Sequence, residues 1–554
     1  MLDRLLHFLR FSTKASRSLG VFQIFFLQGG PATMADKEVS PASNRRDAIK
    51  SSVHNIAAQR RRQHAVTLGK ERRQALIRTK RMCREVICDY SEDSLETDIL
   101  LNEEETALDS QIFQVVENLK SALQLQGKGA LQRKIEALRA LRRLLSKTDS
   151  PPIEATLKAD VIPALVQCLS FGSQDEQLLE AAWCLTNIAA GEPEETRSLV
   201  PSLPLLIAHL GENSSLPVAE QCAWALGNVA GEEEELRNIL LAQGALIPLA
   251  RLMLSNKGST ARTAAWALSN LIKGPDSRAA TDFIKIDGIL DSIVQHLKVG
   301  DDELATEVAW VVVYLTALSD AALHVLAKSE VVQLLIGRLA ASENLQLLLP
   351  LLRSLGNLIA GSGYISNAVL VVGQDITNHV LSSLVKCLKS ENRVLKKEAS
   401  WVLSNIAAGS LQHKEFIFSS ESTLVLLHLL SNSPFDIRKE AAYVLGNLCV
   451  SPGGDGTRPP DIIVNHLVSL INHGCLPGFI NLVRSPDIEA ARLGLQFLEL
   501  VMRGMPNAEG PKLVEMEDGI DAMERFQFHE NEEMRNMANT LVDKYFGEDY
   551  GLDD

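Results

Sequence analysis

Apolar residues recur from about residue 111 onward with the three- and four-residue spacing of amphipathic helices. One phrase, AAWCLTNIAAG at 181–191, returns several times with its small, aromatic and amide residues in the same order. A second apolar helix pattern separates the copies, as at 161–169, 245–254, 288–297, 330–339 and 379–388. No two-residue alternation competes with this period, so the pattern predicts an all-α protein.

The copies share a pair of residues four positions apart. The pairs are Trp183 and Asn187, Trp224 and Asn228, Trp266 and Asn270, Trp310 and Tyr314, Arg353 and Asn357, Trp401 and Asn405, and Tyr443 and Asn447. Their second members are 41, 42, 44, 43, 48 and 42 residues apart, and a period of about 40–47 residues is typical of armadillo repeats. We therefore expect a right-handed superhelical armadillo-repeat solenoid of about ten repeats over residues 111–546.

Glycines follow most copies of the phrase and are placed to end the helix that carries it. These glycines are Gly191, Gly231, Gly274, Gly361 and Gly409.

Residues four apart share one face of a helix, so each pair presents its two side chains together. A single Trp is usually core and a single Asn near a helix end is often a cap. A repeated pair indicates a binding role as well, because neighbouring helices are 8–10 Å apart and an extended peptide crossing them would meet one helix about every three residues. Side-chain amides can hold a peptide backbone, and tryptophan rings can flank Lys or Arg stems. The ladder therefore predicts binding of an extended basic peptide.

Charge is unevenly distributed along the 554 residues, whose formal net charge is -14. Residues 44–84 hold 13 Lys or Arg against Asp47 and Glu71, a charge of +11, which leaves -14 - 11 = -25 for the remainder. An acidic stretch without basic residues follows, up to Asp109. This order predicts a flexible basic N-terminal arm over 44–88, an acidic linker over 89–110 and an acidic repeat body. The acidic total argues against a nucleic-acid partner.

The two ends carry short extra segments. Residues 1–43 are expected to be an extension without fixed structure, and 547–554 an acidic tail. The first 33 residues are basic and partly apolar, which leaves open a transit peptide or an upstream extension with Met34 as an alternative start.

Several function classes lack their signatures. Aromatic residues are only 5% of the chain, so an aliphatic core is expected. The eight cysteines form no C-x-x-C pair, so we expect ordinary core thiols, no metal and no disulfide framework. The longest apolar run, 308–318, is too short to cross a membrane. Phosphate-binding, nucleophile-elbow and zinc-protease motifs are absent from the sequence, which predicts a protein that is not an enzyme and needs no cofactor.

The repeats resemble those of the importin-α family, the adaptors for classical nuclear localisation signals. The resemblance covers about residues 44–546. It rests on W-A-L-G-N-V-A-G at 224–231, W-A-L-S-N at 266–270, and a W-x-x-x-Y repeat followed by an R-x-x-x-N repeat. The basic arm resembles the family's importin-β-binding domain, with Gly69 where the family has Arg. The resemblance implies that importin-β would contact Arg60, Arg61, Arg62, Leu68, Lys70, Arg72, Arg73, Lys80 and Arg81.

The same resemblance implies two sites for lysine side chains. The main pocket would use Gly191, Thr196 and Glu232, where the family has Asp at the last position. The minor site would use Glu398 and Glu440, each three residues before a ladder aromatic, and Tyr443 replaces the family's Trp. The final run, 519–546, resembles the repeat that recruits the export receptor.

The resemblance thus implies a nuclear import adaptor that shuttles between cytoplasm and nucleus and binds cargo proteins, importin-β and an export receptor. Two alternatives stay open from the sequence. One is a divergent armadillo protein that keeps the binding surface but serves another partner, and the other is a general scaffold of the catenin type. The basic arm is the discriminating feature, because a scaffold does not need it.

Overall fold

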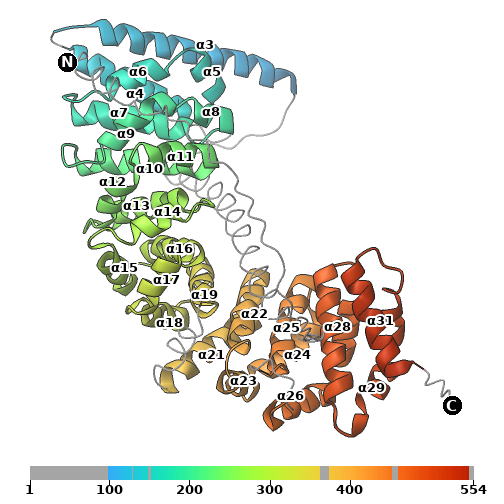
Figure 1. Cartoon of the computed structure of the whole chain (residues 1–554). Coiled ribbons are helices and arrows are strands. Elements are labelled where there is room, and N and C mark those ends of the chain that lie inside the picture. Colours follow the sequence, from blue (N-terminus) through green and yellow to red (C-terminus); the bar gives the residue numbers. More distant parts are fainter. Residues whose placement is uncertain (1–97, 128, 147–150, 362–373, 452–458, 548–554) are drawn as a thin grey trace, which may run out of the picture. The chain divides into compact units, whose positions relative to one another are not determined.

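The computed structural model describes residues 98–127, 129–146, 151–361, 374–451 and 459–547, and gives only the backbone for 98–107 and 374–379. Every regular element among these residues is a helix, as predicted. One helix of each repeat carries the predicted pair or its equivalent, and we call this series the ladder helices (Figure 1). They are α4 (Ala130–Leu145), α7 (Asp175–Ile188), α10 (Leu216–Glu232), α13 (Gly258–Ile272), α16 (Asp302–Leu318), α19 (Leu345–Ile359), α22 (Arg393–Ala407), α25 (Phe435–Leu448), α28 (Ile488–Gly504) and α31 (Glu532–Phe546).

The helix that precedes each ladder helix along the chain packs against it, and we call this series the second-row helices. They are α6 (Ile162–Cys168), α9 (Leu203–Ala208), α12 (Leu246–Met253), α15 (Ile289–Lys298), α18 (Val331–Ala341), α21 (Gln374–Lys389), α24 (Ser422–Asn432), α27 (Leu476–Val483) and α30 (Gly519–Glu524). Short helices connect the repeats. They are α5 (Ile153–Lys158), α8 (Pro193–Arg197), η1 (Val200–Ser202), α11 (Glu234–Ala242), α14 (Arg278–Phe283), α17 (Asp320–Ala327), α23 (Leu411–Phe418), α26 (Asp461–Asn472), η2 (Pro506–Ala508) and α29 (Gly510–Met516).

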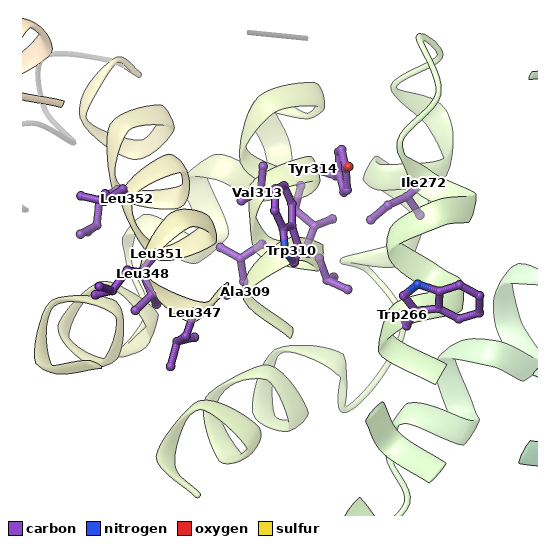
Figure 2. Packing of buried hydrophobic residues seen from close by; sticks show 14 of the residues in the cluster. Trp266, Ile272, Ala309, Trp310, Val313, Tyr314, Leu347, Leu348, Leu351 and Leu352 are labelled. Atoms are coloured by element: carbon purple, nitrogen blue, oxygen red, sulfur yellow. The ribbon is translucent and has the colours of Figure 1, made fainter. Parts of the chain in front are cut away.

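Each ladder helix packs against the ladder helix of the next repeat, from α4 through to α31. The core between them is aliphatic, as the composition predicted, with Leu226, Leu268 and Leu315 fully buried on three successive ladder helices. Figure 2 shows this packing over α13, α16 and α19, where Ala309 lies toward the leucines of α19 and Tyr314 lies toward Ile272 of α13. Each repeat therefore buries its apolar faces against its neighbours.

The second-row helices carry their own hydrogen bonds between repeats. His209 Nε2 lies 2.7 Å from the Leu169 carbonyl oxygen, and His296 Nε2 lies 2.8 Å from that of Met253. In α18, Arg338 Nε donates to the Leu297 carbonyl oxygen at 2.9 Å. Each of these hydrogen bonds joins a second-row helix to the one of the preceding repeat. The acceptor is a carbonyl at or near the C-terminal end of that helix, where carbonyl groups have no partner within the helix.

Two expectations about boundaries differ from the structure. Helix α3 (Asp98–Gln124) begins inside the segment predicted as the acidic linker, because Ile112, Val116 and Leu119 are buried at helical spacing and the helix continues N-terminal to them. Gly231 does not end its helix, since α10 continues to Glu232.

The other glycines after the phrase lie beyond their helix ends without a positive φ. A Cβ on Gly191 would lie 2.1 Å from Glu195 Oε2, and one on Gly409 would lie 2.5 Å from His413 Nδ1. Both neighbouring side chains belong to capping boxes that open the next helix. These glycines therefore make room for the start of a helix, which the sequence analysis did not predict.

The six cysteines among the described residues are all buried and unbonded to one another. Burial raises the pKa of the Cys168 thiol to about 12 and that of Cys387 to about 11. These thiols are therefore protonated and behave as small core residues, as predicted.

Among the described residues no single helix has the length and hydropathy to cross a membrane. Helices α26 and α27 taken together have the required length and hydropathy, but the chain bends by 85° between them.

Candidate functional site

The ladder helices bring the predicted pairs together on neighbouring elements. Each pair lies on one ladder helix, from Trp183 and Asn187 on α7 to Tyr443 and Asn447 on α25. Because successive ladder helices pack side by side, neighbouring pairs stand next to one another across the repeats. We call the surface formed by these pairs the ladder face. The series lapses at α28, where Leu495 and Glu499 occupy the pair positions and Leu495 is fully buried.

The ladder asparagines join one repeat to the next. Asn228 Nδ2 donates to the Thr186 carbonyl oxygen at 3.1 Å, and Asn270 Nδ2 to that of Gly227 at 3.1 Å. Three further asparagines make the same hydrogen bond at 3.1–3.2 Å. In each case the acceptor is the carbonyl oxygen of the residue just before the second pair position of the preceding ladder helix. They are Asn357 to Val313, Asn405 to Gly356 and Asn447 to Ser404. The sequence analysis assigned these repeated asparagines to peptide binding, and the structure shows that their amides also join one ladder helix to the next.

The same small residues receive the aromatic rings of the next repeat. A Cβ on Gly227 would lie 2.3 Å from Trp266 Cζ3, and one on Gly356 would lie 1.9 Å from Trp401 Cζ3. Real Cβ atoms do not approach so closely, so glycine is required for these rings to lie flat against the preceding helix. Ring and amide thus use the same residue of the neighbouring repeat.

Exposure along the ladder face divides it into three parts. Trp183 and Trp224 are half-buried at one end, and Trp401 and Tyr443 are half-buried at the other. Between them Trp266 is 6% exposed, Trp310 3% and Tyr314 4%. The aromatic surface available to a ligand therefore lies mainly in two separate stretches.

A buried ion pair occupies the middle of the ladder. Arg353 donates through Nε and Nη2 to Glu398 Oε1, at 3.1 and 2.6 Å, and both side chains are less than 10% exposed. The Arg353 guanidinium also lies over the Trp310 ring, 5.8 Å from its centroid. Glu398, predicted to receive a ligand's cationic group, is thus already bonded to a cation of its own chain. Glu440, the other predicted carboxylate of this stretch, is half-buried on α25.

The predicted lysine pocket gathers residues from three consecutive segments. Gly191 lies between α7 and α8, Thr196 is fully buried on α8, and Glu232 is the last residue of α10, which packs on α8. The Thr196 hydroxyl donates to the Ala189 carbonyl oxygen at 3.4 Å. Beyond Glu232, the carboxylates of Glu233 and Glu235 each lie 2.7 Å from Arg197. The pocket thus stands beside a strongly acidic turn.

One rung was missed by the sequence analysis. Arg142 on α4 and Ser146, the residue that follows this helix, lie 41 residues before Trp183 and Asn187. Asn187 Nδ2 donates to the Ser146 Oγ at 3.1 Å. The 41-residue step is a signal that would have found it, but Arg and Ser do not match the Trp and Asn of the phrase.

Other predicted residues lie elsewhere. The nine residues assigned to importin-β binding, from Arg60 to Arg81, are outside the described residues. The C-terminal run 519–546 forms α30 and α31. Among the described residues no group of His, Cys, Asp and Glu is arranged to hold a metal ion.

Comparisons with known proteins agree with this architecture. Residues 149–190 and 234–273 match the model of the armadillo/beta-catenin-like repeat, and residues 175–229 match that of a HEAT-like repeat. Importin subunit alpha-9 of Arabidopsis thaliana is 66% identical over 514 residues, which cover 93% of this chain and 99% of that protein. The chain belongs to the importin-α family.

A second member, importin subunit alpha-2 of Oryza sativa subsp. japonica, is 64% identical over 524 residues, covering 94% of this chain and 99% of the relative. The solenoid fold is also found in an engineered protein of known structure, which superposes with a TM-score of 0.67 at 23% identity. That likeness covers 78% of this chain and 98% of the engineered one. The predicted armadillo solenoid is thereby confirmed.

Proposed function

We propose that this importin-α family member is a nuclear import adaptor that binds the basic nuclear localisation signals of cargo proteins on its ladder face. The observation that carries the proposal is the repeated pair of aromatic ring and amide, whose rings are half-buried at both ends of the ladder and are accompanied by Glu232 and Glu440. A rigid series of this kind matches an extended peptide about every three residues.

The chemistry of the pairs suits a basic peptide. Asn228 uses one amide N–H for the Thr186 carbonyl, and its Oδ1 has no hydrogen-bond donor among the described residues. A buried acceptor without a donor costs free energy, and a peptide N–H would satisfy it. The flanking tryptophan rings attract cationic side chains, and the carboxylates select them over neutral ones.

Titration of a lysine-rich peptide into two single variants tests the site. Glu232→Gln should weaken binding about tenfold, because it removes the carboxylate at the ladder face. Glu235→Gln is the matched control, since it removes the same charge from an exposed residue of the same turn, paired with Arg197. Equal effects of the two variants would show that only the general acidic field matters.

The basic arm over residues 44–88 is proposed to dock to importin-β, and the C-terminal helices α30 and α31 to meet the export receptor. The chain would then shuttle between cytoplasm and nucleus with its cargo. The support is the charge of +11 over residues 44–84 and the family membership of the whole chain.

A pull-down on immobilised importin-β separates this role from that of an armadillo scaffold. The full chain should be retained, and a chain lacking residues 1–88 should be lost from the resin while keeping its helical circular dichroism. Retention of the shortened chain would exclude the arm as the docking segment.

A further inference from the structure

The first rung of the ladder holds a cation of its own. Arg142, on α4, places its guanidinium over the Trp183 ring of α7, 4.3 Å from the ring centroid. Its Nε lies 2.6 Å from Glu180 Oε2, and the two side chains are 20% and 10% exposed. Glu180 stands three residues before Trp183 on the same helix. An aromatic face and a carboxylate thus enclose the guanidinium as they would enclose a ligand's side chain.

A related arrangement occurs at the centre of the ladder, with the ring on the other side of the arginine. Arg353 takes the aromatic position of its rung, lies over Trp310, and bonds Glu398, which stands three residues before Trp401. In both places an Arg replaces the ladder aromatic and reaches forward to the carboxylate of the next ladder helix. The forward ion pair from the aromatic position is thus shared by both places. Trp183 lies on the helix after Arg142, whereas Trp310 lies on the helix before Arg353, so only at α4 do the ring and the carboxylate belong to the same helix.

We propose that Arg142 is an internal pseudo-ligand that closes the ladder face at α4. Its guanidinium occupies the cation slot between α4 and the Trp183 ring, so that a bound basic peptide can place a Lys or Arg side chain only beyond Trp183. Residue 142 thereby sets how many cationic side chains the chain selects at this end. The consequence for peptides rests on the proposed function, whereas the occupancy of the slot does not.

Arg139 provides a matched control. Its Nε lies 3.5 Å from Glu180 Oε1, on the same carboxylate that Arg142 bonds, and it also pairs with Glu176. Arg142 is the one of the two that lies over the Trp183 ring. Arg139→Ala and Arg142→Ala therefore remove the same charge beside the same carboxylate, and only the second opens the slot.

Occupancy of the slot is tested with propylguanidinium, which has the stem and head group of an arginine side chain. At low millimolar concentration it should raise the thermal midpoint of Arg142→Ala relative to sodium chloride at equal ionic strength. The wild-type chain and Arg139→Ala, in which Arg142 fills the slot, should show a smaller rise. An equal rise in all three chains, or no rise in Arg142→Ala, would overturn the pseudo-ligand assignment.

The effect on peptides is tested with a lysine-rich core peptide extended by Ala-Ala-Lys or Ala-Ala-Ala, at either terminus. The three-residue extension corresponds to one ladder helix. In Arg142→Ala one of the two lysine-extended peptides should bind about fivefold more tightly than its alanine counterpart. The wild-type chain and Arg139→Ala should discriminate less than twofold.

The outcomes distinguish the occupied slot at α4 from peptide binding on the ladder face. If the wild-type chain already prefers a lysine extension, or if Arg142→Ala does not gain a preference while the core peptide binds, the closed end is excluded. If no chain binds the core peptide, the proposed function fails, and the propylguanidinium shift alone decides whether the slot exists. Should Arg142→Ala not fold, Arg142→Gln withdraws the cation while keeping a hydrogen bond to Glu180, and the same peptide comparison then decides.

Discussion

Asn228 illustrates what a single ladder residue does. It is 1% exposed and donates to a carbonyl of the preceding repeat. Its replacement would remove a buried hydrogen bond and leave that carbonyl oxygen without this donor. Its Oδ1 has no hydrogen-bond donor among the described residues. On the proposed function a peptide N–H would donate to this oxygen, so the nitrogen would serve stability and the oxygen recognition.

Arg353 and Glu398 form a buried ion pair, unlike the exposed ion pairs of the same region. Arg393 and Asp436 lie 2.7 Å apart with the arginine side chain 62% exposed, and such pairs contribute about 0–1 kcal/mol. In the buried pair both Arg353 donors share one oxygen, Glu398 Oε1, and burial carries a large desolvation cost. Its net contribution to folding is therefore small, while the loss of one partner is costly. Its role at the centre of the ladder is therefore to fix the position of α19 relative to α22.

His413 gives a pH-dependent contribution to stability. Burial, with a smaller contribution from the neighbouring Lys414 cation, lowers the pKa of this imidazole from its usual 6.5. The neutral ring closes the capping box of α23, where Nδ1 accepts from the Ser410 backbone N–H at 3.4 Å. Because the unfolded chain takes up the proton first, stability is fully present above pH 6.5 and falls as the pH drops through the folded value.

The expected result is a lower thermal midpoint for the wild-type chain at pH 5.5 than at pH 7.5, with a contribution from this site of about 1 kcal/mol or less. His413→Gln keeps an acceptor at the capping position without titrating, and it should reduce the difference between the two pH values. An unchanged difference would assign the acid sensitivity to other groups.

At the scale of the elements, the fit of a ring against the preceding helix is predicted to control stability. Gly356→Ala would place a Cβ 1.9 Å from Trp401 Cζ3 and should destabilise the chain by about 1–3 kcal/mol. Gly446 occupies the equivalent position in α25, where the nearest atom, Leu493 Cδ1, would be 3.7 Å from a new Cβ. Gly446→Ala should therefore be neutral or stabilise by up to about 1 kcal/mol through helix propensity.

Urea unfolding of the two variants, followed by circular dichroism, measures this difference. Both substitutions add one methyl group to a ladder helix at the same position, so composition is matched. Equal midpoints for the two variants would contradict the close packing of Trp401 on Gly356.

The elements themselves were largely predictable from the sequence, because the apolar period of each helix is local information. The ladder and second-row helices follow the predicted pattern, and the family comparison confirms the solenoid. Contacts between repeats were not predictable in the same way. The Arg142 and Glu180 pair and the Arg353 and Glu398 pair join residues 38 and 45 positions apart, and no local pattern marks them. The extent of α3 was missed because its first residues carry only acidic charges, as a linker would.

At the scale of the whole chain, charge separates the arm from the body. Residues 44–84 carry +11 and the remainder of the chain carries -25, and the two are joined covalently. A tethered segment acts at a millimolar effective concentration, so even weak contact between the arm and the ladder face would compete with a basic cargo peptide. Importin-β, by binding the arm, would then favour cargo binding, and the coupling must be reciprocal.

We expect a modest coupling of about 1–2 kcal/mol, at the lower end of the usual range. The acidic stretch from Asp89 to Asp109 offers the arm a nearer partner, and Gly69 weakens the arm where the family has Arg. The measurement is the titration of a fluorescent basic peptide into the full chain and into a chain lacking residues 1–88, at matched salt. The shortened chain should bind more tightly, and the gap should narrow as salt rises, because screening weakens the attraction between arm and body. Equal affinities at low salt would leave the arm as a docking segment only.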